Sequence, residues 1–203
     1  MMAGIGPFAI PLAINQDYRV YANDLNPASY KYLVSNTKRN RCDARLRSYN
    51  LDGRDFIQHL IDQNVLFHEV ILNLPQSAVH FLDVFVGLHC KYNNADNALS
   101  DTDLVLPRIH VYSFTNNMDQ PVQAVVEEVA KVLRCSVTDL GYDNSINIVS
   151  DENSLMIPCH GHIVRDVAPR KLMICVSFTL PKSVALQEPI REVTNITKKS
   201  RLN

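Results

Sequence analysis

A glycine turn near the start of the chain is the first feature that could do chemistry. Residues 3–11 read AGIGPFAIP, in which Gly4 and Gly6 flank one residue and Pro7 can open a helix. Glycines at a strand-to-helix turn let the backbone approach a nucleotide closely, because they carry no Cβ. The spacing therefore predicts a nucleotide-binding turn, with Gly4 and Gly6 as candidate cofactor-binding residues.

Two carboxylates follow at the expected ends of successive strands. Asp24 lies about 18 residues after Gly6, where an acidic residue can accept hydrogen bonds from both ribose hydroxyls of a nucleoside. Asp52, directly before Gly53, can accept from an adenine amino group. Each aspartate taken singly could be an ordinary helix-initiating or turn residue. Their joint placement favours a nucleoside ligand.

The same glycines also satisfy a dinucleotide fingerprint, Gly4-x-Gly6-x-x-Ala9. A pyrophosphate needs free backbone N–H groups at the start of the helix, whereas Pro7 has none and Phe8 is bulky. A cofactor without phosphates, S-adenosylmethionine, suits this turn better. An NAD-dependent oxidoreductase stays open as an alternative.

Asn73-Leu74-Pro75 closes a hydrophobic segment where the reacting group would lie. The Asn73 amide can accept a hydrogen bond from the exocyclic amine of a base, and the proline stiffens the loop. In this position the tripeptide resembles the motif with which base-methylating enzymes hold a planar base beside the methyl donor.

Helix and strand patterns alternate along the chain. We expect helices over residues 7–13, 27–40, 53–63, 78–88 and 122–133, the second and third capped by Asn26 and Asp52. We expect strands over residues 18–22, 45–49, 67–72 and 108–114, and an antiparallel hairpin of 162–167 with 171–180. Residues 91–103 are expected to form a surface loop. This order predicts an α/β fold, a parallel sheet with helices on both faces.

Composition limits the function classes. With 203 residues, 46% of them hydrophobic, the chain can form one domain with a real core. A formal net charge of −1 provides no overall electrostatic attraction for nucleic acid, so a polyanion would need a local patch. Five scattered cysteines without a CxxC pair indicate reduced thiols in an intracellular protein. No apolar run is long enough to span a membrane.

Three further patterns are weaker evidence for a functional site. Residues 159–162, CHGH, have metal-ligand spacing, but chance clusters of this kind are commoner and we expect no metal site. Ser113 and His110 would lie on opposite faces of a strand, which argues against a hydrolase. A basic cluster could contact phosphates or form a solvated helix end: Lys38, Arg39, Arg41, Arg45 and Arg47.

The segments AGIGPFAIP, ANDLNP, NLDGRDF, NLPQSAVHFL, HVYSF and VRDVAPRK occur in this order. Together they resemble the methyltransferase domain of the archaeal and eukaryotic tRNA (guanine-N1)-methyltransferase family, over residue 3 to about residue 181. The resemblance implies a Rossmann-like class I methyltransferase fold. It also implies methyl transfer from S-adenosyl-L-methionine to N1 of guanine at tRNA position 37, next to the anticodon.

By this resemblance, Asp24 and Leu25 bind the ribose and adenosine. Asp52 and Gly53 bind the adenine end, and Asn73 the cofactor or the target guanine. The family's general base and its assisting arginine lie upstream of the glycine turn, so the catalytic residues of this chain stay unknown, with Asn73 as a base-positioning candidate.

The family also carries a strand and tRNA-binding domains ahead of the glycine turn. We therefore expect residues 1–181 to be a methyltransferase domain without its first strand and those domains, and residues 182–203 to be a polar, disordered tail. A catalytically incomplete fragment that binds cofactor or RNA only is the alternative. We expect tRNA as partner, no membrane, a monomer, and a place in the cytoplasm, nucleus or mitochondrial matrix.

Overall fold

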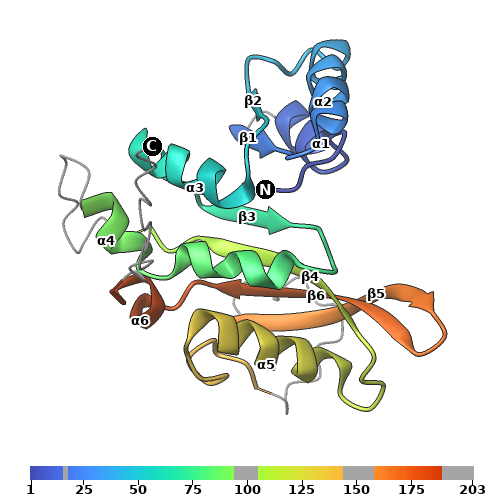
Figure 1. Ribbon diagram of the computed structural model, residues 1–203, viewed down its shortest axis with the longest axis vertical. Coiled ribbons are helices and arrows are strands. Elements are labelled where there is room, and N and C mark those ends of the chain that lie inside the picture. The colour runs from blue at the N-terminus through green and yellow to red at the C-terminus, as the bar shows by residue number, and fades with distance from the viewer. Residues whose placement is uncertain (16–17, 94–104, 144–157, 189–203) are drawn as a thin grey trace, which may run out of the picture.

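A computed structural model describes residues 1–15, 18–93, 105–143 and 158–188 (Figure 1). The elements in chain order are α1 Ala9–Ile14, β1 Val20–Asn23, α2 Pro27–Arg39, β2 Leu46–Tyr49, α3 Gly53–Asp62, β3 Glu69–Leu72, the 3-10 helix η1 Ala78–Phe85, α4 Leu88–Asn93, β4 Arg108–Thr115, α5 Pro121–Leu133, β5 Cys159–Ala168, β6 Lys171–Thr179 and α6 Lys182–Ala185. None of the described helices is long and apolar enough to cross a membrane.

The strands form two sheets. β1 and β2 pair in parallel, with Val20 opposite Leu46. The second sheet has the order β3-β4-β6-β5, in which β3 is parallel to β4 and β6 is antiparallel to both of its neighbours. The expected C-terminal hairpin is therefore confirmed. The two sheets approach each other along β1 and β3, as Figure 1 shows.

Helices cover both faces of the smaller sheet. α1 and α2 enclose a small apolar cluster with one face of β1 and β2, in which Ala13, Leu33 and Leu46 are buried. α3 lies on the other face, where the rings of Tyr49 and Phe56 are 5.2 Å apart. α3 is amphipathic and buries only one side of its surface, which includes Phe56 and Leu60.

The main core lies between the larger sheet and the helices η1 and α5. Alternate residues of β4 are buried under these helices, including Ile109 and Val111. The opposite face of β4 presents half-buried side chains such as His110 and Tyr112. This alternation is the period-2 pattern of a strand whose two faces meet different environments.

Several expected boundaries differ from the structure. α2 and α3 begin after Asn26 and Asp52 as predicted, and each of these side chains accepts a hydrogen bond from the backbone N–H two residues on. α1 begins at Ala9, so Pro7 belongs to the preceding turn rather than to the first helical position. The single helix expected over 78–88 is two helices, because Gly87 has a φ of +69° between η1 and α4.

The C-terminal part also differs in detail. α4 continues to Asn93, into the segment expected as a loop, whose residues 94–103 lie outside the described residues. α6 follows the boundary expected at residue 181, and its Val184 and Ala185 are buried in the main core. The packed part of the chain therefore extends at least to Ala185. Residues 189–203 lie outside the described residues.

Candidate cofactor-binding site

The predicted site residues lie at the carboxyl ends of strands. Asp24 directly follows β1, Asp52 comes shortly after β2, and Asn73 directly follows β3. Residues 1–3 bridge these ends, because the Met1 amine donates to the carbonyl of Ile71 at 3.0 Å and the N–H of Ala3 donates to the carbonyl of Asn23 at 2.8 Å. Carboxyl ends of parallel strands are where ligands bind in α/β sheets.

The glycine turn is hydrogen-bonded to the side chain of Asp24. The N–H of Gly4 donates to Oδ2 of Asp24 at 2.7 Å, and the side chain of Asn36 in α2 donates to the carbonyl of Ile5 at 2.9 Å. Gly4 and Gly6 have φ values of +55° and +101°. A Cβ on Gly6 would come within 2.9 Å of Ile10 and Leu33 side-chain atoms, so the turn requires glycine there.

The N–H groups of this turn are directed inward. Gly4 donates to Asp24, Gly6 donates to the carbonyl of Ala3 at 2.9 Å, and Pro7 has no N–H to offer. A pyrophosphate needs several such groups pointing at it. The turn is therefore better suited to a ligand without phosphates.

Asp24 keeps capacity for a ligand. Its Oδ1 accepts from the N–H of Asn26 at 3.0 Å, and its Oδ2 accepts from Gly4. An ionised carboxylate has about four lone-pair sites, so each oxygen can accept one more hydrogen bond. The neighbouring Leu25 is 65% exposed and offers an apolar side chain beside the carboxylate.

Asn23 and Asn50 hold the ends of β1 and β2 together, a role that sequence reasoning assigned to neither residue. Asn23 is 1% exposed. Its amide donates to the carbonyl of Leu51 at 2.9 Å and accepts from the Leu51 N–H at 2.9 Å. Asn50 donates to the carbonyls of Asp24 and Leu25 at 2.7 and 3.0 Å. A polar residue ending an otherwise apolar strand was the available signal for Asn23.

Asp52 caps a helix in addition to its predicted role of accepting a hydrogen bond from adenine. Its Oδ1 accepts from the N–H of Arg54 at 2.8 Å and so caps α3. Among the described residues, Oδ2 of Asp52 has no hydrogen-bond partner. Gly53 is buried, and a Cβ there would lie 2.9 Å from Met1 Cε and 3.1 Å from the Phe81 ring. Gly53 thus permits the close approach of residue 1 to the start of α3.

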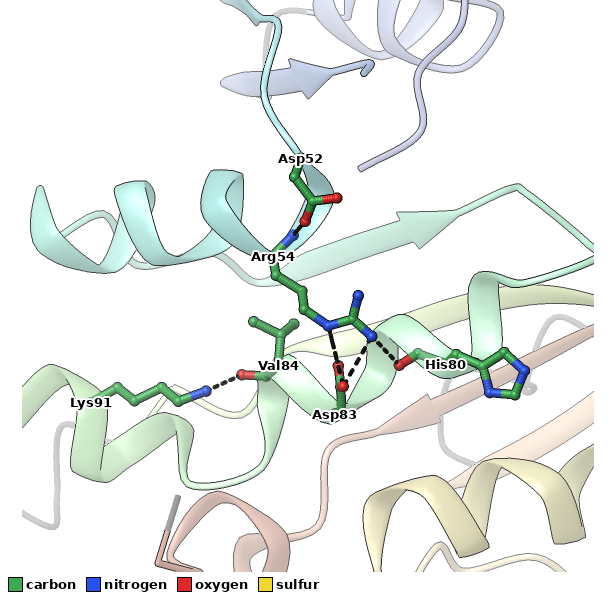
Figure 2. A network of polar contacts seen from close by, with 6 residues as sticks. All are labelled: Asp52, Arg54, His80, Asp83, Val84 and Lys91. Carbon is green, nitrogen blue, oxygen red and sulfur yellow. Dashed lines mark hydrogen bonds and ion pairs between the residues drawn. The ribbon is translucent and has the colours of Figure 1, made fainter. Parts of the chain in front are cut away.

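Arg54 connects α3 to η1, as Figure 2 shows. Its guanidinium donates to both carboxylate oxygens of Asp83 at 3.0–3.2 Å and to the carbonyl of His80 at 3.0 Å. It also lies 4.5 Å from the centroid of the Phe81 ring. This contact holds the helix that follows the Asn73 loop against the helix that follows Asp52.

In the described residues, Asn73 makes no hydrogen bond to the group around Asp24. It is half-buried and lines a cavity of about 840 Å³ together with Ala3 and Ile71, whereas Asp24 and Asp52 do not line it. The carbonyl of Pro75 accepts from the N–H of Phe114 at 3.1 Å, which ties the Asn73 loop to β4. The structure thus brings Gly4 and Asp24 into contact and places Asn73 at the next strand end.

The side chains of the CHGH segment, residues 159–162, do not point to one common site. Cys159 lies on the opposite face of β5 from His160 and His162, and Arg108 approaches Nδ1 of His160 to 3.2 Å. In the described part of the chain, no group of three His, Cys, Asp or Glu side chains is placed to hold a metal ion.

His110 contacts Ser177 rather than Ser113. Its Nδ1 lies 2.7 Å from the Ser177 hydroxyl and its Nε2 lies 2.9 Å from Glu69. Ser177 is only 3% exposed, so its hydroxyl is not accessible to a substrate. Ser113 is buried on the other face of β4, which supports the argument against a hydrolase.

A comparison with models of protein families identifies the family of this chain. Residues 1–138 match the model of the TRM5/TYW2 methyltransferase domain. The chain belongs to this family. The match covers the glycine turn, Asp24, Asp52 and Asn73, so every candidate site residue falls within the TRM5/TYW2 methyltransferase domain.

Curated relatives in the same family are similar over most of this chain. A tRNA (guanine(37)-N(1))-methyltransferase of Phytophthora infestans is 39% identical over 185 residues, which cover 91% of this chain and 38% of the relative. The Xenopus tropicalis protein of the same name is 37% identical over 202 residues, covering 92% of this chain and 35% of the relative. The chain thus spans little more than a third of their length.

Solved structures of TRM5/TYW2 proteins share the fold. The Methanocaldococcus jannaschii tRNA m1G37 methyltransferase superposes with a TM-score of 0.53 at 22% identity, covering 90% of this chain and 42% of that one. The Pyrococcus horikoshii TYW2 structure with MeSAdo gives a TM-score of 0.54 at 17% identity, covering 90% and 55%. The expected Rossmann-like class I methyltransferase fold is confirmed.

Proposed function

We propose that this chain is the methyl-transferring domain of a tRNA (guanine(37)-N1)-methyltransferase. The observation that carries the proposal is the hydrogen bond between the Gly4 N–H and the Asp24 carboxylate at a strand end, in a chain of the TRM5/TYW2 family. The names of the relatives from Phytophthora infestans and Xenopus tropicalis support guanine 37 of tRNA as the substrate.

The donor set fits S-adenosyl-L-methionine. The remaining lone pairs of Asp24 would accept from the two ribose hydroxyls, and the exposed Leu25 side chain would pack on the adenine. Oδ2 of Asp52 would accept from the adenine amino group, and the backbone of Gly53, which packs against Met1 and Phe81, would lie beside the adenine. Gly4 and Gly6 would let the turn approach the methionyl part, where no phosphate has to be bound.

When bound, S-adenosylmethionine would supply a sulfonium methyl group, an electrophile for a ring nitrogen of guanine. Asn73 would hold the guanine by accepting from its exocyclic amine, with Pro75 tied to β4 keeping the loop in place. The enzyme's contribution is chiefly proximity and alignment. An amide cannot take the proton that N1 loses, so the general base is a group other than Asn73.

The partner of this site would be tRNA. The exposed basic side chains of Lys38, Arg39, Arg41 and Arg47 at and after the end of α2 could contact its phosphates, or could remain solvated. Such a substrate would be met in the cytoplasm, nucleus or mitochondrial matrix, and the chain would act as a monomer.

Ligand titration tests the cofactor. We expect the protein to bind S-adenosylhomocysteine and not NADH in isothermal titration calorimetry. Binding of NADH alone would support the oxidoreductase alternative and overturn the proposal. Lys131→Ala, a variant of an exposed residue of α5 that does not contact the candidate site, serves as the control for folding.

A methyl-transfer assay tests the reaction. We expect a methyl group to be transferred to a tRNA transcript that carries guanine at position 37, and not to a transcript with adenine there. Binding of S-adenosylhomocysteine without transfer would support the alternative of a catalytically incomplete domain that binds cofactor or RNA only. Equal transfer to both transcripts would overturn the assignment of the target base.

A further inference from the structure

The hairpin of β5 and β6 projects from the molecule at the edge of the sheet where the candidate site lies. β4 is parallel to β3, and its last residue, Thr115, is opposite Leu172 near the start of β6. The turn that joins β5 to β6 therefore lies beyond the carboxyl ends of β3 and β4, and Figure 1 shows the hairpin extending past them. Asn73 follows β3 at the same edge. Residues 165–171 are named the hairpin tip below.

The hairpin tip carries a local excess of positive charge in a chain whose formal net charge is −1. Arg165 and Arg170 are exposed, and Lys171 is half-buried. Within the described residues, none of these three side chains forms an ion pair. Asp166 is the one acid in the sequence of the hairpin tip. Surface cations without a carboxylate partner are available to the phosphates of a nucleic acid.

Arg165 and Lys171 share one face of the hairpin, and Asp166 lies on the other face. Arg165 is opposite Met173, which is two residues from Lys171 in β6 and is itself opposite Phe114 of β4. Opposite residues of antiparallel strands share a face, and so do residues two apart in one strand. The two cations therefore lie on the face of the sheet that carries Phe114, away from the acid.

Contacts connect this face to the loop after β3 and to the glycine turn. Nζ of Lys171 lies 4.6 Å from the centroid of the Phe114 ring, and the Phe114 N–H donates to the carbonyl of Pro75 at 3.1 Å. Two residues earlier in β4, the ring of Tyr112 lies 5.9 Å from the ring of Phe8, which is 39% exposed. Aromatic rings thus extend from the glycine turn to the cations of the hairpin tip.

We propose that this face of the hairpin tip binds the RNA backbone beside the target guanine, in a single-stranded loop. The proposal rests on the proposed function, in which Asn73 holds that guanine. Cations that contact phosphates, combined with aromatic rings that stack on bases, are the features with which proteins bind single-stranded nucleic acid. Arg165, Arg170 and Lys171 would contact the phosphates, and the exposed ring of Phe8 would stack on a base.

The basic cluster at the end of α2 lies at the opposite edge of the strands. α2 begins after the carboxyl end of β1 and ends at Arg39, and β2 begins at Leu46. Lys38 and Arg39 therefore lie near the amino ends of β1 and β2. The hairpin tip lies at the carboxyl ends, as Asn73 does. Of these two basic surfaces, the hairpin tip is the one that an RNA loop would meet on reaching Asn73.

RNA binding by the full chain tests the proposal. The probe is a fluorescent anticodon stem-loop of tRNA with guanine at position 37, and fluorescence anisotropy gives its Kd at several salt concentrations. We expect Arg165→Ala and Lys171→Ala each to weaken binding about three- to tenfold, and to reduce the salt dependence of log Kd by about 0.7 per lost phosphate contact. Lys131→Ala, in the last turn of α5, is the charge-matched control and should leave the Kd unchanged.

Arg170 offers a variant that suits the fold. Its φ is +57°, a conformation that glycine adopts without strain. Arg170→Gly should therefore fold normally by circular dichroism and still lose about three- to tenfold in RNA affinity. Asp166→Ala removes a charge from the other face and should not weaken RNA binding. Affinity for S-adenosylhomocysteine should stay unchanged in all these variants, because the hairpin tip makes no hydrogen bond to Asp24 within the described residues.

The outcomes separate this proposal from the proposed function. Unchanged RNA affinity in the hairpin variants, or no RNA binding by the unmodified chain, would overturn the hairpin contact. A loss confined to Lys38→Ala and Arg39→Ala would also overturn it, in favour of the end of α2. Equal losses for the stem-loop and for a fully paired stem would overturn the assignment to a single-stranded loop. RNA binding that depends on the hairpin tip, without methyl transfer, would support the contact and contradict the proposed reaction.

Discussion

The N–H of Gly4 donates to Oδ2 of Asp24 at 2.7 Å, so the glycine turn and the end of β1 share one carboxylate. The turn is therefore placed by the same side chain that is proposed to bind the ribose. A ligand that bonds to Asp24 would meet a carboxylate whose orientation is already fixed by Gly4 and Asn26. Such preorganisation reduces the entropy lost on binding.

Asp24→Ala should weaken binding of S-adenosylhomocysteine about 100-fold or more, because hydrogen bonds to a charged group contribute about 1.5–3 kcal/mol each. Asp24→Asn keeps an acceptor for Gly4 but loses the charge, and we expect a smaller loss of about tenfold. Calorimetric titration of both variants measures the difference. Unchanged affinity in Asp24→Ala would contradict the assignment.

The two glycines of the turn should differ in their tolerance of a side chain. Gly6→Ala places a Cβ against Ile10 and Leu33 at a φ of +101°, and we expect it to lower the free energy of unfolding by about 2–4 kcal/mol. Gly4→Ala meets nothing within 4 Å at a φ of +55° and should cost about 1 kcal/mol. Urea unfolding of both variants gives the comparison, and equal losses would refute it.

Asn23 should contribute more to stability than its exposed neighbour Asn50. Asn23→Ala leaves the carbonyl and N–H of Leu51 without their partner in a part-buried place, which costs about 2–4 kcal/mol. Asn50→Ala frees the carbonyls of Asp24 and Leu25 to solvent, and we expect a loss of about 1 kcal/mol or less. Chemical unfolding measures both, and a larger loss in Asn50→Ala would show that this account of the strand ends is wrong.

The Met1 amine should make stability depend on pH. Its pKa falls from 8.0 in the unfolded chain to about 5 in the folded one through burial, so between these values only the unfolded state binds the proton. Stability should therefore rise with pH from 5 to 8, by up to about 1.4 kcal/mol per unit. Nα-acetylated protein, which lacks the titrating amine, is the control. Identical pH profiles for the two proteins would argue against a buried amine.

Local patterns in the sequence predicted the helices with clear caps. Asn26-Pro27 and Asp52-Gly53 placed the starts of α2 and α3 correctly, because the N-cap bond is made within two residues. Pro7 was a weaker guide. Residues 6–8 belong to a turn in which the Gly6 N–H donates to the Ala3 carbonyl, so α1 begins only at Ala9.

Contacts distant in sequence decided what local patterns could not. The largely apolar segment over residues 78–88 predicts one helix, but the N–H of Gly87 donates to the carbonyl of Val184 at 3.0 Å and its φ is +69°. That contact joins the middle of the chain to α6 and breaks the helix into η1 and α4. No pattern within residues 78–88 could indicate a partner nearly 100 residues away.

By itself, the sequence determined the α/β class, the family and the residues at the strand ends, because motif spacing and side-chain periodicity are properties of short segments. Only the tertiary structure decided how those residues are held: Asp24 on the Gly4 N–H, Asn23 across to Leu51, and Arg54 from α3 to Asp83. It also decided that β1 and β3 face each other across an apolar groove, since strand order depends on packing between segments far apart in the chain.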